Sequence, residues 1–446
     1  MLSAIAFVVF ALWCTVMAFR RHPIYGLAFY LATTYVFPQG RWWGEFLGET
    51  RWALIAAAVT ICAVAMHRGK LNPKPHWLGS APAVIMTLYA AWMWLETPLA
   101  LALAEHIEGT IKYTKYVLSF WFFYRIIDSR EHLRDVLLLH VLGCTLLGVL
   151  AFMQGRTDGR LDGVGGPGID DSNTLGMYLV TGTLVAFGLF LTETGWRRWL
   201  CLPCMVLTAN GFVLANSRGA FLGFIAGGLV ILLCKARRHR RMFWAFALVG
   251  ALGFVSLIDQ TFITRMYTIE DVTSESPEAD SSARSRVEVA RAQLQMFLDY
   301  PAGTGHRGTV VLSPRYLDRV WLTTARGEDE DSAARSSHNS FLTALVEQGF
   351  IGAMLFAGYL FWTLGAIVRL RRYDKRGGDP NLVTLSAAMC GALTAVFVAG
   401  NTADYLMAEV QFWLYAGIVS ALQFFETAQA ARLRDRLLAP LQRSPA

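Results

Sequence analysis

Charged residues are scarce in this chain, and lysine is the rarest of them. Only 16% of the 446 residues are charged, against about 25% in soluble domains, and 34 Arg stand against six Lys. The net charge of +7 comes from basic residues in short connections between apolar blocks, where such residues set membrane orientation. The charge therefore does not indicate a nucleic-acid partner.

Several common functional signatures are also missing. All seven cysteines lie in or beside apolar blocks, so no disulfide framework is expected. Cys201 and Cys204 have CxxC spacing but lie inside an apolar stretch, which disfavours a metal or redox role for the pair. The first apolar stretch lacks a basic segment and a small-residue cleavage site, which favours a membrane span over a signal peptide. The turn at 301–306 has two glycines, but no strand precedes it and no GK[ST] follows it, so it is not a Walker or Rossmann loop.

Long apolar runs dominate what is present. Hydrophobic residues make up 54% of the chain, and the mean hydropathy is +0.40. The runs are about 15–25 residues long, which is the length that crosses a hydrocarbon core, whereas a β-barrel would show short alternating segments. The sequence therefore predicts an all-α polytopic membrane protein with about 12–13 transmembrane helices. The candidate spans are 2–19, 24–38, 52–67, 82–104, 110–127, 134–153, 173–192, 197–215, 219–234, 242–258, 341–368, 382–402 and 409–425.

One of these candidate spans carries residues that disfavour a continuous helix. The segment 82–104 contains Glu96 and Pro98, and proline removes a helix hydrogen bond. We expect this segment to break or to re-enter the membrane in part.

Basic residues recur at every second connection between the spans. They cluster at 20–21, 67–74, 125–134, 197–198, 235–241 and 369–376 and in the tail at 432–443. The positive-inside rule assigns these connections to the cytoplasm. The connections 39–51, 105–112, 154–172, 216–218, 259–340 and 403–408 then face outward. The C-terminus lies inside, and the N-terminus lies outside if all thirteen segments span, or inside if one does not.

The outer loop at 259–340 is the only soluble-looking region. It contains nine Arg, no Lys and 13 acidic residues. Its residues 283–300 have the apolar spacing of an amphipathic helix, with Val287, Ala290, Leu294 and Phe297 or Leu298 on the apolar face. We therefore divide the chain into transmembrane helices at 1–258, this large loop, C-terminal transmembrane helices at 341–425 and a tail at 426–446.

Arginines in outward-facing segments are candidates for binding an anion, because the guanidinium fork bonds phosphate oxygens bidentately. Arg218 stands in a tight turn near the depth of lipid head groups, and the alternative is an arginine that only snorkels to the interface. Arginines in the first half of the amphipathic helix are not favoured by its dipole, so they either hold an anion or pair with Asp280 and Glu288. Because arginine is far more frequent than lysine throughout this chain, the presence of any single loop arginine can also be explained by composition alone. The further candidates are Arg284, Arg286, Arg291, Arg265 and Arg160.

His338 ends the outer loop just before the apolar segment 341–368. An imidazole at the junction of a water-facing loop and the bilayer can take a proton from a lipid-borne substrate. The alternative is a helix cap or a surface residue, although the neighbouring Asn339 and Ser340 cap equally well. His306 is a second candidate base.

Polar residues in two other outward connections are further candidates. Asp171 and Asn173 precede a span, where they either cap its helix or bind an acceptor sugar, with the aspartate as a possible general base. A metal is disfavoured there, because no other clear carboxylate cluster accompanies them. Asn401, Asp404 and Tyr405 either line the site or, for Tyr405, anchor the interface.

The order of these motifs resembles one known family. Residues 217–223, SRGAFLG, look like the SRG-type motif of the O-antigen ligase and polymerase family. Residues 336–342, SSHNSFL, followed by EQGFIG at 347–352, look like its H-N-x-[YF]-L…E-x-G-[FLI]-[IL]-G signature. An arginine-containing helix and a proline–glycine turn lie between them. The resemblance covers about 200–355, and the ordered set is more specific than any single motif.

The resemblance implies a GT-C-like glycosyltransferase that moves a glycan from undecaprenyl pyrophosphate to an acceptor on the periplasmic face of the bacterial inner membrane. In an O-antigen ligase the acceptor is a sugar of the lipid A–core, the anomeric centre inverts, and no metal or other cofactor takes part. His338 would be the base, and Arg218, Arg286, Arg284 and Arg265 would bind the pyrophosphate. Supporting or acceptor-binding roles would fall to Arg160, Asp171, Asn173, Asn339 and Glu347.

Three other functions stay open. A polymerase of the same family would use another glycan repeat as acceptor, and an O-oligosaccharyltransferase would use a protein Ser or Thr. A polymer or anion transporter would carry internal repeats with broken helices in matching halves, and no clear repeat is visible in the sequence. The sequence does not decide the acceptor.

Overall fold

The computed structural model describes residues 2–156, 161–258, 263, 281–322 and 333–438. The chain is an all-α polytopic membrane protein, as predicted. Its α-helices are α1 (Leu2–Arg20), α2 (Ile24–Val36), α3 (Trp52–Met66), α4 (Ala81–Glu96), α5 (Leu103–Ile126), α6 (Arg130–Gln154), α7 (Ser172–Thr192), α8 (Gly195–Ala215), α9 (Arg218–Cys234), α10 (Arg240–Leu257), α12 (Ser281–Asp299), α13 (Gly308–Tyr316), α14 (Ser340–Glu347), α15 (Gly349–Lys375), α16 (Pro380–Ala399) and α17 (Glu409–Leu438).

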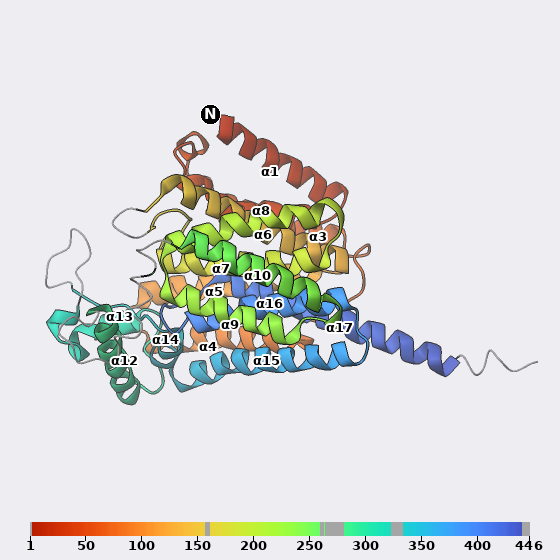
Figure 1. Ribbon diagram of the computed structural model, residues 1–446. Helices are drawn as coiled ribbons and strands as arrows, with labels where there is room; N and C mark the ends of the chain where they lie inside the picture. Colours follow the sequence, from red (N-terminus) through yellow and green to blue (C-terminus); the bar gives the residue numbers. More distant parts are fainter. Residues whose placement is uncertain (1, 157–160, 259–262, 264–280, 323–332, 439–446) are drawn as a thin grey trace, which may run out of the picture.

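The long helices lie side by side and form one bundle (Figure 1). The short helices α13 and α14 gather with α12 at one end of it, and α17 runs out of the opposite end (Figure 1). The first residues of α1 lie toward the end that carries α12 to α14. The start of α1 and the end of α17 therefore lie at opposite ends of the bundle, which favours an odd number of crossings. With the C-terminus inside, an odd number corresponds to the alternative in which the N-terminus lies outside.

Small residues let α16 lie close to α9 in the centre of the bundle. A Cβ added to Gly223 would lie 2.7 Å from the Ala395 carbonyl oxygen, and one added to Gly227 would lie 2.5 Å from that of Gly391. Such close backbone approach is typical of helices packed in membranes. These contacts run antiparallel, so the start of α9 lies beside the end of α16.

Within the described ranges, six helices are long and apolar enough to cross a membrane, namely α1, α6, α7, α8, α15 and α16. The helix α9 and the helix that follows it pass the same test only as a pair, bent by 114°. The other expected spans are helical but shorter or more polar, so the total of 12–13 crossings stays a prediction.

Two expected spans are interrupted. The first helix of segment 82–104 ends at Glu96, where we expected a break, and α5 begins at Leu103. Segment 341–368 was expected as one helix, and this prediction was wrong, because α14 ends before Gln348 and α15 begins after it. The cause is Gly349, which has a left-handed φ of 64° and packs so closely that an added Cβ would lie 2.4 Å from the Ala302 carbonyl carbon.

The amphipathic helix of the outer loop forms as α12, but it buries a different face from the expected one. Val287 and Leu294, expected to face inward, are 42% and 50% exposed. The buried face lies two residues further on, where Gln293 donates its Nε2–H to Ser337 Oγ at 2.9 Å. Its apolar members are Val289, Ala292 and Met296. Both faces of α12 carry apolar residues, so periodicity alone did not identify the buried face. The buried face is the one that contacts Ser337.

Candidate active site

Local hydrogen bonds fix Arg218 at the start of α9. Asn216 has a left-handed φ of 53° and reverses the chain after α8. The Ser217 hydroxyl then accepts from the Ala220 N–H at 3.3 Å, which is the cap expected of serine at this position. Arg218 is the first helical residue and is only 7% exposed. Its burial argues against an arginine that merely reaches out to the membrane surface.

The start of α7 lies directly beside this turn. Asp171 caps α7 by accepting from the N–H groups of Asn173 and Thr174 at 2.9 and 3.0 Å, so the capping alternative holds for Asp171. Asn173 Oδ1 accepts from the Ser217 hydroxyl at 3.0 Å. Both residues therefore lie beside Arg218, and both have structural hydrogen bonds there.

His338 stands at the start of α14. Asn339 Oδ1 accepts from the N–H groups of Phe341 and Leu342 at 2.9 and 3.1 Å. Asn339 is thus the helix cap, and the half-buried His338 precedes it. The imidazole is therefore not needed to cap the helix, which leaves the catalytic alternative open for it.

The connection between α16 and α17, residues 400–408, ties these helix ends together. Ser340 Oγ accepts from the Tyr405 N–H at 2.7 Å, which attaches the start of α14. A Cβ added to Gly219 would lie 1.8 Å from Thr402 Oγ1, so the start of α9 touches the same connection. The N-termini of α7, α9 and α14 therefore converge around it.

This convergence favours a negatively charged ligand. Each helix N-terminus carries about half a positive charge and offers free N–H groups. The hydroxyl of Tyr405 is buried and has no hydrogen-bond partner among the described residues. Burial and then the charges of Asp171 and Asp404 raise the pKa of this hydroxyl, and the Arg286 cation opposes the rise. Arg286 on α12 is thus within electrostatic reach of the same region.

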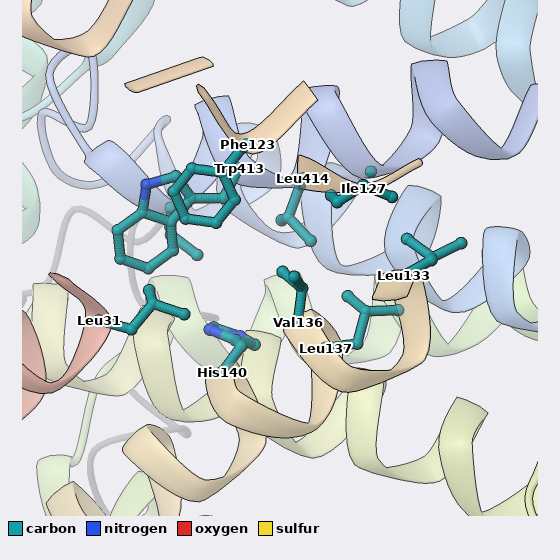
Figure 2. Close-up of a pocket in the computed structure, with 11 residues that line it drawn as sticks. Leu31, Phe123, Ile127, Leu133, Val136, Leu137, His140, Trp413 and Leu414 are labelled. Carbon is teal, nitrogen blue, oxygen red and sulfur yellow. The ribbon is translucent and has the colours of Figure 1, made fainter. Parts of the chain in front are cut away.

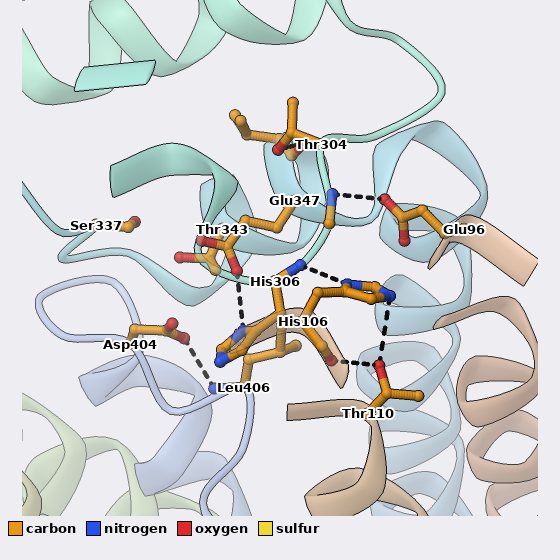
Figure 3. A network of polar contacts seen from close by, with 12 residues as sticks. Glu96, His106, Thr110, Thr304, His306, Ser337, Thr343, Glu347, Asp404 and Leu406 are labelled. Carbon is orange, nitrogen blue, oxygen red and sulfur yellow. Dashed lines mark hydrogen bonds and ion pairs between the residues drawn. The ribbon is translucent and has the colours of Figure 1, made fainter. Parts of the chain in front are cut away.

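Glu347 lies at the other end of α14 and pairs with a different histidine. His306 Nδ1 is 3.2 Å from Glu347 Oε2 (Figure 3), and the His306 backbone N–H donates to His106 Nδ1 at 2.9 Å. That bond puts the His106 proton on Nε2, which donates to the Met93 carbonyl at 2.9 Å. The residue oriented by Glu347 is therefore His306, the second candidate base. Glu347 and His338 stand at opposite ends of α14, whose eight residues span about 12 Å.

Asp404, in the connection 400–408, lies near Glu347 and His306 (Figure 3). Its carboxylate accepts from the Leu406 N–H at 2.9 Å. Enclosure by protein and then the Glu347 charge raise the pKa of Asp404 to about 6, against the lowering effects of that hydrogen bond, His306 and Thr343. The side chain nevertheless remains open to solvent. A carboxylate with a raised pKa that still reaches solvent can exchange protons near neutral pH.

A comparison with protein families agrees with these motifs. Residues 203–357 match the family model described as O-antigen ligase. This segment, about a third of the chain, is therefore similar to the O-antigen ligases. Members of this family are glycosyltransferase-like enzymes that act on lipid-linked glycans. None of the curated proteins matches the chain significantly.

The matched segment contains most of the residues that the motifs predicted. The helix starts that carry Arg218 and His338 both touch the 400–408 connection, and the cap of α7 lies beside the first of them. Arg286 lies within electrostatic reach of the connection. Glu347 belongs instead to the pair with His306. Arg160 and Arg265 lie outside the described residues, and so does the side chain of Arg284.

Glu96, outside the matched segment, contributes to this candidate site in a way that sequence reasoning missed. Its Oε1 accepts from the Gly305 N–H at 3.1 Å (Figure 3). Its other oxygen is buried without a hydrogen-bond partner among the described residues. The carboxyl thus holds the turn that presents His306. The available signal was an acidic residue in an apolar run, which is a functional candidate by default.

An apolar cavity deeper in the bundle lies apart from this candidate site (Figure 2). Its volume is about 20 Å³, and Phe123, Val136 and Trp413 are among its lining residues. His140 on its wall bonds the Tyr35 hydroxyl at 2.5 Å. The space suits about one water molecule, so it cannot hold a sugar.

Proposed function

We propose that this protein is an O-antigen ligase that transfers a glycan from undecaprenyl pyrophosphate to a sugar of the lipid A–core. The reaction takes place at the periplasmic face of the bacterial inner membrane, in a GT-C-like fold. The observation that carries the proposal is the convergence of Arg218, His338 and three helix N-termini on the connection 400–408. Donor and acceptor are both membrane lipids, and this site lies at the end of a membrane bundle.

The cationic part of the site suits the departing diphosphate. Arg218 provides a bidentate fork in a buried position, and Arg286 adds a second cation, with Arg284 and Arg265 as further donors from the same loop. Preorganised donors of this kind stabilise charge that develops in the transition state. The N-termini of α7 and α9 add to the same field.

The transfer needs no oxidant, and the donor and the acceptor are its only two substrates. The acceptor oxygen forms a bond to the anomeric carbon from the face opposite the leaving group, which inverts that centre. The bond from this carbon to the diphosphate oxygen breaks, and the electron pair leaves with undecaprenyl pyrophosphate. His338 takes the acceptor proton, as a base with a pKa near the working pH does best. The arginines supply the charge stabilisation that a metal ion would otherwise provide.

Close rivals differ only in the acceptor. An O-antigen polymerase would attach the glycan to another repeat, and a protein O-oligosaccharyltransferase would attach it to Ser or Thr, and the same donor site serves all three. A polymer or anion transporter would need no base at position 338. The acceptor therefore has to be found by experiment.

The test compares the wild type with His338→Ala and His306→Ala. Each purified protein receives polyprenyl-pyrophosphate glycan and lipid A–core in the presence of EDTA, and gels show the glycan ladder on the acceptor. We expect transfer by the wild type, none by His338→Ala, and reduced transfer by His306→Ala. Free polymer would indicate a polymerase. Transfer to added peptide alone would indicate a protein acceptor, and no transfer to any acceptor would favour the transporter. Full activity of His338→Ala would remove His338 as the base.

A further inference from the structure

Two histidines and a carboxylate meet at the end of the bundle opposite the proposed active site. His22 lies in the turn between α1 and α2, and Asp128 and His132 lie at the start of α6. The helix α5 separates this end from His106 by about 30 Å. One potential ligand atom of each of the three side chains lies within 4.8 Å of the other two. Because the residues come from two different connections, only the fold brings them together.

The carboxylate of this cluster is held in place by its surroundings. Asp128 Oδ2 accepts from the Asn72 N–H at 2.8 Å, and the Asn72 side chain donates to the Asp128 carbonyl at 3.3 Å. Asp128 Oδ1 lies 2.6 Å from His132 Nδ1. Ligands of a metal are typically oriented by outer hydrogen bonds of this kind.

His22 is the member of the cluster whose bonding is incomplete. Its ring stacks on that of His132 with centroids 3.9 Å apart, and its Nδ1 accepts from the Ile24 N–H at 3.2 Å. Its Nε2 is buried and has no hydrogen-bond partner among the described residues. A buried nitrogen without a partner is unfavourable, and a shared cation would remove this deficit.

We propose that His22, Asp128 and His132 form a binding site for a divalent transition-metal ion of the zinc type. Two imidazoles and a carboxylate suit Zn²⁺, whose tetrahedral ligands stand roughly 3.3 Å apart. The ion displaces the proton shared by His132 and Asp128, as metal binding generally does, and the rings open slightly around it. Both histidine residues are partly exposed, so the cluster lies near the protein surface, and water would fill the fourth position of the ion.

The ion would add a link between the N-terminal helices and the rest of the bundle, against which Leu27 and Leu31 of α2 already pack. The helices α1 to α3 have their own small core, which includes Phe7, Phe29 and Ala56. A metal between His22 and the start of α6 links the turn of this unit to the main bundle. Its role is therefore structural, and it does not depend on the proposed glycan transfer.

The test uses tag-free, full-length protein in detergent, stripped with EDTA and desalted. Equilibrium dialysis against ZnCl₂ followed by elemental analysis should find one zinc per chain, and the Tm should rise with zinc concentration. Substituted Co²⁺ should give a visible spectrum of nitrogen and oxygen ligation. His22→Ala and Asp128→Asn should each weaken zinc binding by at least about tenfold. His76→Ala, in another connection assigned to the same side of the membrane, is the matched control and should bind as the wild type does.

Zinc content at the level of the blank would overturn the proposal. Equal binding by wild type and His22→Ala would also overturn it, because the ion would then sit elsewhere. If His22→Ala does not fold, Asp128→Asn still tests the site, since asparagine keeps the oxygen that accepts from Asn72. Glycan transfer by the stripped protein reports separately on the proposed function.

Discussion

At the scale of single residues, Arg218 allows geometry to be separated from charge. Lysine keeps the positive charge but cannot bond two diphosphate oxygens in one plane. We predict that Arg218→Lys lowers the initial rate of glycan transfer about 10²-fold, which is the effect of losing one preorganised donor. Arg291→Lys is the matched control, because Arg291 is exposed and bonds Glu288 at 3.1 Å. Full activity of Arg218→Lys would reject the bidentate role.

Asp404 should give the fold a pH dependence of known sign. Its carboxyl has a pKa of about 6 in the folded protein and a normal value of 3.8. Between about pH 4 and 6 the unfolded chain ionises first, so this carboxyl's contribution to the free energy of unfolding falls as the pH rises, and it is lost above about pH 6. Asparagine can still accept from the Leu406 N–H. We predict that Asp404→Asn has the Tm of the wild type near pH 4 and a higher Tm at pH 7.5.

The exposed Asp318 supplies the control for this comparison. Asp318→Asn should differ from the wild type by the same amount at both pH values. A Tm difference for Asp404→Asn that does not grow with pH would show that the carboxyl titrates normally.

At the scale of elements, Asp171 tests whether a helix cap is also part of the reaction. Asparagine caps a helix as well as aspartate does, whereas alanine costs about 1 kcal/mol. We predict that Asp171→Asn keeps both stability and transfer, and that Asp171→Ala lowers the free energy of unfolding by about that amount. Loss of transfer in a stable Asp171→Asn would assign the carboxylate a role in acceptor binding or proton transfer.

The turn before α13 depends on a glycine that cannot be replaced. Gly303 has a φ of 107°, and an added Cβ would lie 2.0 Å from Glu96 Oε1. We predict that Gly303→Ala lowers the free energy of unfolding by about 2–5 kcal/mol, from backbone strain and overpacking together. Gly163→Ala is the control, because Gly163 has a φ of 77° with open space around it. Equal losses in the two variants, measured by thermal unfolding, would show that the contact with Glu96 does not matter.

The elements that local sequence could predict are those specified by local chemistry. The cap at Asp171, the extent of α12 and the break at Glu96 follow from neighbouring residues, and all three are observed. The buried face of α12 and the pairing of Glu347 with His306 depend on contacts between segments far apart in the chain. No periodicity within one segment contains that information, so the sequence pointed to His338 and Glu347 but not to their separate surroundings.

At the scale of the whole molecule, the remaining question is on which side of the membrane each end lies. The start of α1 and the helices α12 to α14 lie toward one end of the bundle, and α17 leaves at the other (Figure 1). Together with the basic connections, this arrangement predicts an N-terminus outside and a C-terminus inside. The exposed residues Ser3 and Arg307 are expected on the outer side, and the exposed Lys70 is expected on the inner side.

Single cysteines at these three positions, in a variant without the native cysteines, can be labelled with a membrane-impermeant maleimide. Ser3→Cys and Arg307→Cys should react in cells whose outer membrane alone has been opened, because both lie on the side of the proposed active site. Lys70→Cys should react only after the inner membrane is also opened. Protection of Ser3→Cys with reaction of Arg307→Cys would mean that one expected span does not cross. Protection of Arg307→Cys would place the arginines and His338 in the cytoplasm and exclude a periplasmic ligase.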